Sequence, residues 1–177
     1  MASNPHLIIS AIGPDKVGLV RKISGFVTEN GANIEDSKMA VFCGEFAIIM
    51  LISGNDEILA QIESKQSELG SITGLTVFTR RASERVYSEP MLPCKLSASS
   101  LDHPGIVHRL TTALSEAGVN IESMETKAYA APMSGSPMFH FEARIAVPER
   151  VNFPRLRAHF LSIGEEENID IEMAIVG

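Results

Sequence analysis

The chain has 177 residues, of which 45 % are hydrophobic, and its 22 acidic and 15 basic residues give a formal net charge of −7. A chain of this length and apolar content can bury a core, while its acidity opposes a large phosphate-binding surface and so disfavours direct DNA binding. The N-terminus shows no charged-then-apolar signal pattern, and the longest apolar run, residues 46–52, is far shorter than the roughly 20 residues of a membrane-spanning helix. We therefore expect a soluble, cytoplasmic protein with no membrane segment.

One stretch of the chain occurs twice. Residues 15–35 recur as residues 102–122 at a constant offset of 87 positions, so the matched positions align without a gap. Because such a repeat indicates a duplicated structural unit, we predict two small domains, residues 1–80 and residues 94–177. The intervening segment, residues 81–93, is polar and partly basic and ends in a proline, which favours a linker.

The first unit begins with a strand and a helix. Residues 6–12 are β-branched and apolar and stop at Gly13-Pro14, which is typical of a buried strand followed by a turn. Apolar residues then recur at helical spacing between Asp15, a candidate N-terminal cap, and Gly31, a candidate C-terminal cap. These apolar positions are Leu19, Ile23, Phe26 and Val27.

The rest of the first unit completes a β-α-β-β-α-β order. Two strand-like apolar runs meet at Gly44, which predicts a hairpin with a tight turn. A second helix, capped by Asn55 or Asp56 and ended by Gly70, leads to a fourth strand at residues 72–79. This order is the split βαβ, or ferredoxin-like, arrangement. We therefore predict an α+β fold with two βαββαβ domains and antiparallel sheets.

The second unit repeats this order with a longer hairpin loop. Residues 130–137 are rich in proline, glycine and serine where the first unit has its tight turn. Asp102 and Gly118 are the matching candidate helix caps. The predicted strands are residues 94–99, 120–129, 139–147 and 168–176, and the predicted helices are residues 104–117 and a segment with Pro154 in its first turn.

The segments that open the first helix of each unit resemble those of ACT domains, which are small-ligand-binding regulatory modules. Asp15-Lys16-Val17-Gly18 and Asp102-His103-Pro104-Gly105 are similar to the family's common Asp-Arg-Pro-Gly form, and the second copy is the nearer one. The duplication, together with Gly135-Ser136-Pro137-Met138-Phe139 at the entry to a strand, is similar to tandem ACT proteins of the glycine cleavage system transcriptional repressor type. The first copy departs from the common form at Lys16-Val17, so its site is expected to differ or to be empty.

The repeated loop offers the chemistry that an amino acid ligand requires. Backbone N–H groups at the helix start, exposed by Gly18 and Gly105, can hold a carboxylate at the positive end of the helix dipole. Carboxylate or amide oxygens nearby can accept from the ligand's ammonium group. The resemblance implies binding in this region, often where two ACT units meet. The candidate ligand-binding residues are Asp15, Lys16, Gly18, Leu19, Asn33, Ile34, Asp102, His103, Gly105, Ile106, Asn120 and Ile121.

Structural roles compete with ligand binding at several of these residues. For Asp15 and Asp102 we favour a role as helix caps over direct ligand contact. Asn33 and Asn120 serve equally well in the turn after each helix. Either role is compatible with ligand contact.

We predict no metal, cofactor or disulfide role for the histidines and cysteines of the chain. His103 and His108 lack the spacing of a known zinc motif. Cys43 and Cys94 form no Cys-x-x-Cys motif and occupy strand-like runs, where buried thiols are common. The predicted linker and its border carry a small basic cluster, which is either solvated or a contact for a partner. Its members are Arg80, Arg81 and Arg85.

These observations predict a regulatory protein that senses a small amino acid, with glycine as the first candidate, and that acts through a protein partner. No nucleophile or phosphate-binding motif is present, so we expect no enzymatic activity. Exposed edge strands of small sheets invite pairing, which favours a homodimer. Two alternatives stay open: a ligand-free ACT adaptor for protein–protein interaction, and a small enzyme of amino-acid or one-carbon metabolism.

Overall fold

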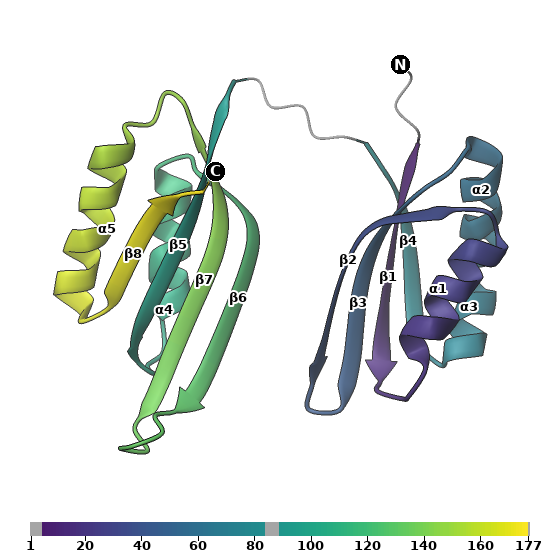
Figure 1. Cartoon of the computed structure of the whole chain (residues 1–177), viewed down its shortest axis with the longest axis horizontal. Helices are drawn as coiled ribbons and strands as arrows, with labels where there is room; N and C mark the ends of the chain where they lie inside the picture. The colour runs from purple at the N-terminus through teal and green to yellow at the C-terminus, as the bar shows by residue number, and fades with distance from the viewer. Residues whose placement is uncertain (1–4, 84–88, 177) are drawn as a thin grey trace. The chain divides into compact units, whose positions relative to one another are not determined.

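A computed structural model of the chain, shown in Figure 1, describes residues 5–83 and 89–176. The chain divides into two compact units near residue 85, here called unit one and unit two. Unit one contains a sheet of four strands in the order β2-β3-β1-β4, all antiparallel. Its elements are β1 (His6–Pro14), α1 (Leu19–Glu29), β2 (Asn33–Phe42), β3 (Glu45–Ser53), α2 (Asp56–Ser64), α3 (Gln66–Thr73) and β4 (Thr76–Ala82).

Unit two has the same topology, with the strand order β6-β7-β5-β8. The two units thus confirm the predicted α+β class and the ferredoxin-like order. Strands β4 and β5 each extend a few residues into the segment 81–93 that was predicted as a linker, and residues 84–88 of that segment lie outside the described residues. The elements of unit two are β5 (Met91–Leu101), α4 (Ile106–Glu116), β6 (Asn120–Ala130), β7 (Pro137–Pro148), α5 (Phe153–Glu167) and β8 (Asp170–Ile175).

The predicted capping of the first helices by Asp15 and Asp102 is wrong. Helices α1 and α4 begin four residues later, after Gly18 and Gly105. Both glycines are in the left-handed region, with φ of 91° and 101°, and neither helix start receives a side-chain cap. A left-handed residue turns the chain into the helix directly, and glycine adopts this conformation without a Cβ penalty.

The predicted helix ends are confirmed. Gly31 has φ of 83° and Gly118 has φ of 68°. In α1, the Gly31 amide donates to the Thr28 carbonyl, and the next amide reaches back to the Val27 carbonyl. Gly118 and the residue after it make the same two bonds in α4. This pair of bonds is the Schellman motif, which satisfies carbonyls that the helix leaves unpaired.

The second helix of unit one differs from its prediction. Asn55 caps α2 as expected, because its side chain accepts from the Ile58 amide at 2.8 Å. The helix is then interrupted at Lys65, and α3 continues through Gly70 to end at left-handed Gly74. Gly70 therefore does not end the helix. A Cβ at Gly70 would lie 3.1 Å from the Leu75 carbonyl oxygen, so glycine here permits close packing of α3 against the last strand.

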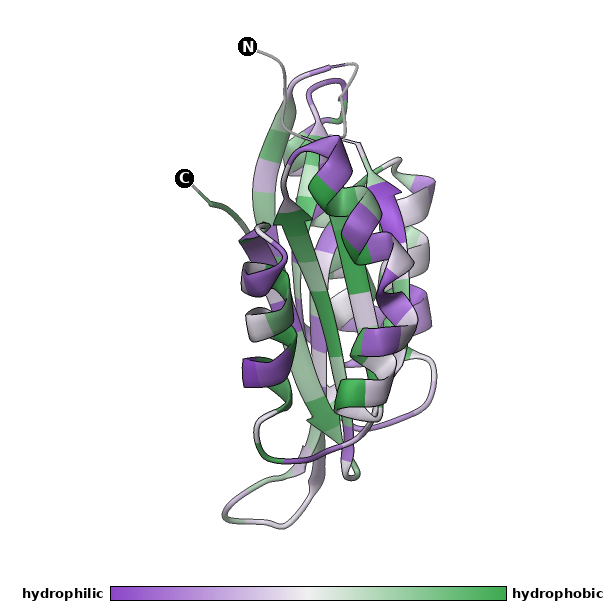
Figure 2. Ribbon diagram, turned by 90° about the vertical axis from the view of Figure 1, so that its right-hand side faces the viewer, coloured by the Kyte–Doolittle hydropathy of each residue, from purple (hydrophilic) through white to green (hydrophobic). Residues whose placement is uncertain are grey.

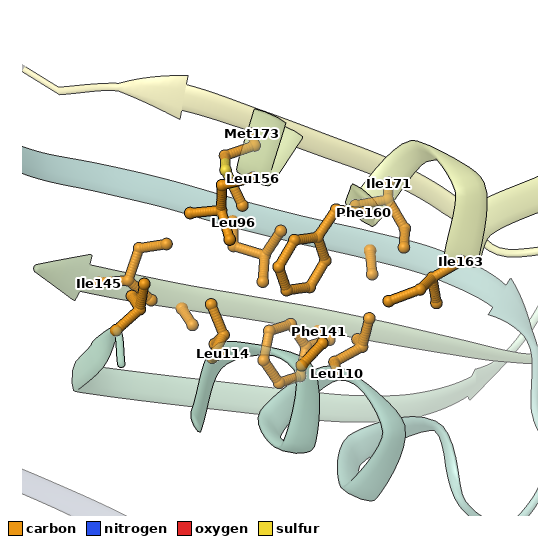
Figure 3. Close-up of a cluster of buried hydrophobic side chains, with 14 of the residues drawn as sticks. Leu96, Leu110, Leu114, Phe141, Ile145, Leu156, Phe160, Ile163, Ile171 and Met173 are labelled. Carbon is orange, nitrogen blue, oxygen red and sulfur yellow. The ribbon is translucent and has the colours of Figure 1, made fainter. Parts of the chain in front are cut away.

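Each unit has a core of its own between its sheet and its helices. Figure 3 shows the core of unit two, where Phe141 from β7 and Phe160 from α5 are fully buried among leucine and isoleucine side chains. Phe46 of β3 has the same role in unit one. Each fully buried side chain of this size stabilises the fold by about 1.5–3 kcal/mol. In Figure 2, hydrophobic segments run along the strands, while the helices carry hydrophilic segments on their outer sides.

Two further sequence interpretations are corrected. Cys43 is exposed in the turn between β2 and β3, with φ of 50°, whereas Cys94 is buried on β5 as expected. Arg81 does not belong to a solvated linker, because it lies on β4 and pairs with Asp56 at 3.2 Å and Glu63 at 2.9 Å on α2. Arg85, the third member of the basic cluster, lies outside the described residues.

Candidate functional site

The loop before α1, and its copy before α4, is held in place by the neighbouring hairpin. The Asp15 amide donates to the Gly44 carbonyl at 2.8 Å, and the Asp102 amide donates to the Pro137 carbonyl at 2.9 Å. Both aspartates therefore contribute backbone bonds that fix the loop, and both side chains remain exposed to solvent.

The helix starts are open to a ligand. A Cβ placed on Gly18 or on Gly105 would meet no atom within 4 Å, and the residues that precede each glycine are exposed as far back as Asp15 and Asp102. The first amides of a helix have no partner inside the helix. In the described chain, no backbone acceptor pairs with the amides of Val20 or Arg21. A carboxylate could approach these N–H groups at the positive end of the helix dipole.

Leu19 and Ile106 lie at this position, but their side chains are core residues. Their exposed fractions are both 3 %. They can offer only backbone atoms to a ligand, so a substitution there would change stability before it changed binding. The sequence pattern could not separate these two roles, because the first residue of an amphipathic helix belongs to both the core and the loop.

The asparagines predicted to complete the site lie elsewhere in their units. Asn33 begins β2 opposite Ser53, whereas the loop follows Pro14, which pairs with Glu45 at the other end of β3. Eight residues of extended chain separate these ends by about 26 Å, so within one unit Asn33 and Ile34 do not face the loop. Asn120 and Ile121 are likewise at the far end of β6. The expected gathering of these residues with Asp15 or Asp102 is wrong within each unit.

The side chains of Asn33 and Asn120 also make hydrogen bonds other than those predicted with the turn after each helix. The Asn33 amide nitrogen donates to Glu35 at 3.0 Å, and the Ser53 hydroxyl donates to the same Glu35 oxygen at 2.5 Å. These two hydrogen bonds hold the pKa of Glu35 below its ordinary value, and the bond from Ser53 has the larger effect. Asn120 donates to the neighbouring Ile121 carbonyl at 3.3 Å.

The electrostatic surroundings of the two loops differ. In unit one, Lys16 approaches Gly74, and Lys22 donates to the Ile72 carbonyl at 3.0 Å, so two cations flank the start of α1. In unit two, the cation at the corresponding turn, Arg109, contacts Glu166 at 3.4 Å and Glu167 at 3.6 Å. Unit one therefore presents more uncompensated positive charge for a carboxylate. The long-range pairing of Arg109 leaves no local sequence signal.

The histidines at the unit-two loop, His103 and His108, are exposed. The Nδ1 atom of His103 lies 3.2 Å from the Pro104 carbonyl oxygen, and its side chain is exposed. Throughout residues 5–83 and 89–176, no three His, Cys, Asp or Glu side chains are placed to hold a metal ion together. Among the same residues, no helix has both the length and the apolar character to cross a membrane.

Comparison with known proteins agrees with this fold. A family model described as an ACT domain matches residues 5–79, which cover most of unit one. Unit two repeats the strand order and the glycine-opened helix start of unit one. Residues 5–79 thus match an ACT domain, and unit two repeats the same strand order.

Similarity to known relatives extends over both units. The glycine cleavage system transcriptional repressor of Escherichia coli (strain K12) is 26 % identical over 178 residues, which cover 99 % of this chain and 93 % of that protein. A crystal structure of an unknown protein from Galdieria sulphuraria matches 99 % of this chain and 100 % of its own, with a TM-score of 0.81 and 30 % identity. A putative glycine cleavage system transcriptional repressor gives a TM-score of 0.69 at 23 % identity over 99 % of each chain. The tandem arrangement thus resembles that of the glycine cleavage system transcriptional repressor.

Proposed function

We propose that this chain is a non-enzymatic, cytoplasmic regulator that binds a small amino acid at the loop before α1 or α4 and passes the signal to a protein partner. The observation that carries the proposal is the pair of exposed, left-handed glycines, Gly18 and Gly105, at the open starts of two helices. Similarity to a transcriptional repressor supports the regulatory role. The net charge of −7 favours action through a protein over direct contact with DNA.

Glycine is the first candidate ligand, because the E. coli relative is named for the glycine cleavage system. Glycine has about five non-hydrogen atoms, and the best tiny ligands gain about −1.5 kcal/mol per atom. The ceiling is therefore about −7.5 kcal/mol, or a Kd of a few micromolar. An affinity at or weaker than this ceiling suits sensing at metabolite concentrations.

Calorimetric titration with a panel of the common amino acids tests the proposal. We expect one small amino acid to bind, and we expect Gly18→Ala or Gly105→Ala to weaken binding about tenfold or more, because a Cβ strains the left-handed turn that presents the amides. The matched control is Gly25→Ala in the middle of α1, where a Cβ meets no atom within 4 Å and φ is not left-handed. A flat response to every amino acid would contradict the proposal.

One observation favours a second function for unit two. Its loop carries Asp102, and the nearest arginine is neutralised by two glutamates. A loop with little net positive charge suits an adaptor surface without a ligand. In that case Gly18→Ala abolishes amino acid binding, whereas Gly105→Ala leaves it unchanged.

We also propose that the chain acts as a homodimer. Strands β2 and β4 form the edges of the unit-one sheet, and β6 and β8 form those of the unit-two sheet. Edge strands present unpaired backbone groups, which favour association. The oligomeric state in solution tests this part of the proposal separately from ligand binding.

A further inference from the structure

One face of the unit-one sheet is apolar and lies opposite the helices. Helices α1, α2 and α3 pack on the other face (Figure 1), and none of the described elements of unit one covers this one. We call it the open face of unit one. Three of its apolar side chains are about half exposed or more: Phe78 at 60 %, Ile12 at 52 % and Ile49 at 49 %. Ile8 and Leu51 complete it and are partly buried.

The matching face of unit two is polar. Strand register identifies the equivalent positions, because Ile49 opposes Ser10 on β1 as Glu142 opposes Ser97 on β5. Every apolar residue named above has a polar or charged equivalent. The pairs are Ile8 and Lys95, Ile12 and Ser99, Ile49 and Glu142, Leu51 and Arg144, and Phe78 and Glu172. The fold itself therefore does not require an apolar open face, and an exposed apolar patch of this kind marks an interaction surface.

The open face also has a hollow at one side. The hollow has a volume of about 230 Å³ and is lined by the apolar side chains Ile8, Ile49 and Leu51 and by Asp36, Ser37 and Lys38. A cavity of about 150 Å³ lined by apolar side chains holds benzene. The hollow on the open face can therefore accept an aromatic side chain from a partner.

The charged side chains of this face stand at its two opposite edges. One row across the sheet contains Arg80, Ile8, Leu51 and Asp36, so Arg80 on β4 and Asp36 on β2 end the same row. In the described chain neither residue, nor Lys38, has an ion-pair partner. Each edge thus carries charges that a partner could neutralise.

The adjacent row ends in an aromatic side chain and a cation. This row contains Phe78, Ser10, Ile49 and Lys38. When two such faces are related by a twofold axis that lies between them and parallel to the strands, β4 of one copy lies opposite β2 of the other. This arrangement sets Arg80 against Asp36 of the second copy. It also sets Phe78 above Lys38 and the hollow of the second copy, where a cation faces an aromatic ring.

We propose that two copies of this chain dimerise face to face through the open face of unit one, about a twofold axis parallel to its strands. This proposal keeps the homodimer proposed above but assigns the contact to the open face of unit one in place of the edge strands. The apolar rows of the two copies meet as in a β-sandwich, with the sheets about 10 Å apart. Arg80 of each copy then pairs with Asp36 of the other, because a twofold axis generates every contact twice.

The size of the face sets the expected strength of the dimer. Four strands about 4.8 Å apart and about seven residues long cover roughly 440 Å² in projection. A standard interface buries about 800 Å² of accessible surface per partner. The open face is therefore large enough for a specific but weak contact, and we expect a dimer that dissociates on dilution.

Sedimentation velocity over a concentration series tests the proposal on the full chain. The wild type should show a concentration-dependent dimer, and Ile49→Glu should raise its Kd about tenfold or more, because it buries two carboxylates in the contact. Ala174→Glu, at an exposed outward position of β8 opposite Lys95, is the matched control and should leave the Kd unchanged. Thermal melting by circular dichroism establishes that each variant is folded.

A charge exchange tests the orientation. Asp36→Arg and Arg80→Asp should each weaken the dimer, because each places like charges opposite one another, and the double variant should restore it. A wild type that is monomeric at every concentration would overturn the proposal, even if it bound lipid vesicles or another protein. A dimer that is insensitive to Ile49→Glu would overturn it in favour of edge pairing. Amino acid titration of Ile49→Glu keeps the two proposals apart, since the loop before α1 lies outside the open face.

Discussion

Cys94 lies on β5 inside the core of unit two, and Cys43 lies in the exposed turn between β2 and β3. Burial raises the pKa of the Cys94 thiol. Because the thiolate is the reactive form, we expect an aromatic disulfide reagent to modify Cys43 rapidly in the native chain and Cys94 only after unfolding. The Cys43→Ser variant should lose the rapid phase. Rapid modification of folded Cys43→Ser would contradict the buried position of Cys94.

Glu35 shows how local hydrogen bonds set a titration. Its pKa lies below its ordinary value of 4.5, first because of the bond from Ser53 and then because of the bond from Asn33. A carboxyl whose pKa is lowered in the folded state contributes stability above its unfolded pKa, and this contribution is lost as the pH falls through the folded pKa. Unit one should therefore lose stability in acid below about pH 4.5.

The Ser53→Ala variant tests this assignment. Carboxyl NMR titration should show that the pKa of Glu35 rises toward its ordinary value, and by more than it rises in Asn33→Ala. The same variant should show a weaker loss of stability at low pH. An unchanged Glu35 pKa in Ser53→Ala would show that the bond from Ser53 does not stabilise the carboxylate.

At the scale of residues, the local sequence predicted backbone conformation more successfully than it predicted side-chain contacts. Gly31 and Gly118 could be assigned as helix ends, because the requirement for a left-handed residue is local. Asp15 and Asp102 were misplaced as caps, because either an aspartate or a left-handed glycine can start a helix. The competing glycine lies only three residues further along. The partners of Glu35 and Arg109 come from distant elements and left no local pattern.

At the scale of elements, a glycine near the end of the last helix lets that helix approach the sheet. A Cβ on Gly164 of α5 would lie 2.5 Å from the Ile169 carbonyl oxygen, a contact with backbone that cannot move aside easily. We expect Gly164→Ala to lower the free energy of unfolding by about 1–3 kcal/mol, the usual cost of overpacking. Chemical denaturation measures this change.

A second glycine supplies the control for this prediction. Gly25 of α1 has open space around its Cβ position and is not left-handed, so Gly25→Ala should raise stability by about 0.5–1 kcal/mol through helix propensity. If Gly164→Ala were as stable as Gly25→Ala, α5 would not be packed against β8 as the structure has it.

Hydrophobic periodicity was sufficient to place the elements but not all of their limits. The first helix of each unit has a clear helical stripe, β7 alternates, and β1 and β3 are apolar runs, all of which a hydrophobic pattern reports directly. The break between α2 and α3 at Lys65 was not foreseen, and Gly70 was taken as a helix end. Gly70 is required instead by the approach of α3 to β4, which is a tertiary contact.

At the scale of the whole molecule, duplication made the fold predictable and the site only partly so. The repeat predicted two similar units, and each has the expected strand order around a core of its own. It could not show that Asn33 stands at the opposite end of the sheet from Asp15, because that depends on strand register. The repeat also could not show that the open face is apolar in unit one and polar in unit two. The side of each strand that faces away from the helices is known only once the helices are placed.

The central claim is that a small amino acid binds at the glycine-opened helix starts. Two-dimensional amide NMR of the full chain during titration with glycine tests it most directly. We predict saturable shifts of the amides at residues 17–21, at residues 105–109, or at both, with smaller changes at the far ends of β2 and β6. If glycine and the other common amino acids at millimolar concentration shifted no amide of these two loops, the claim would be contradicted.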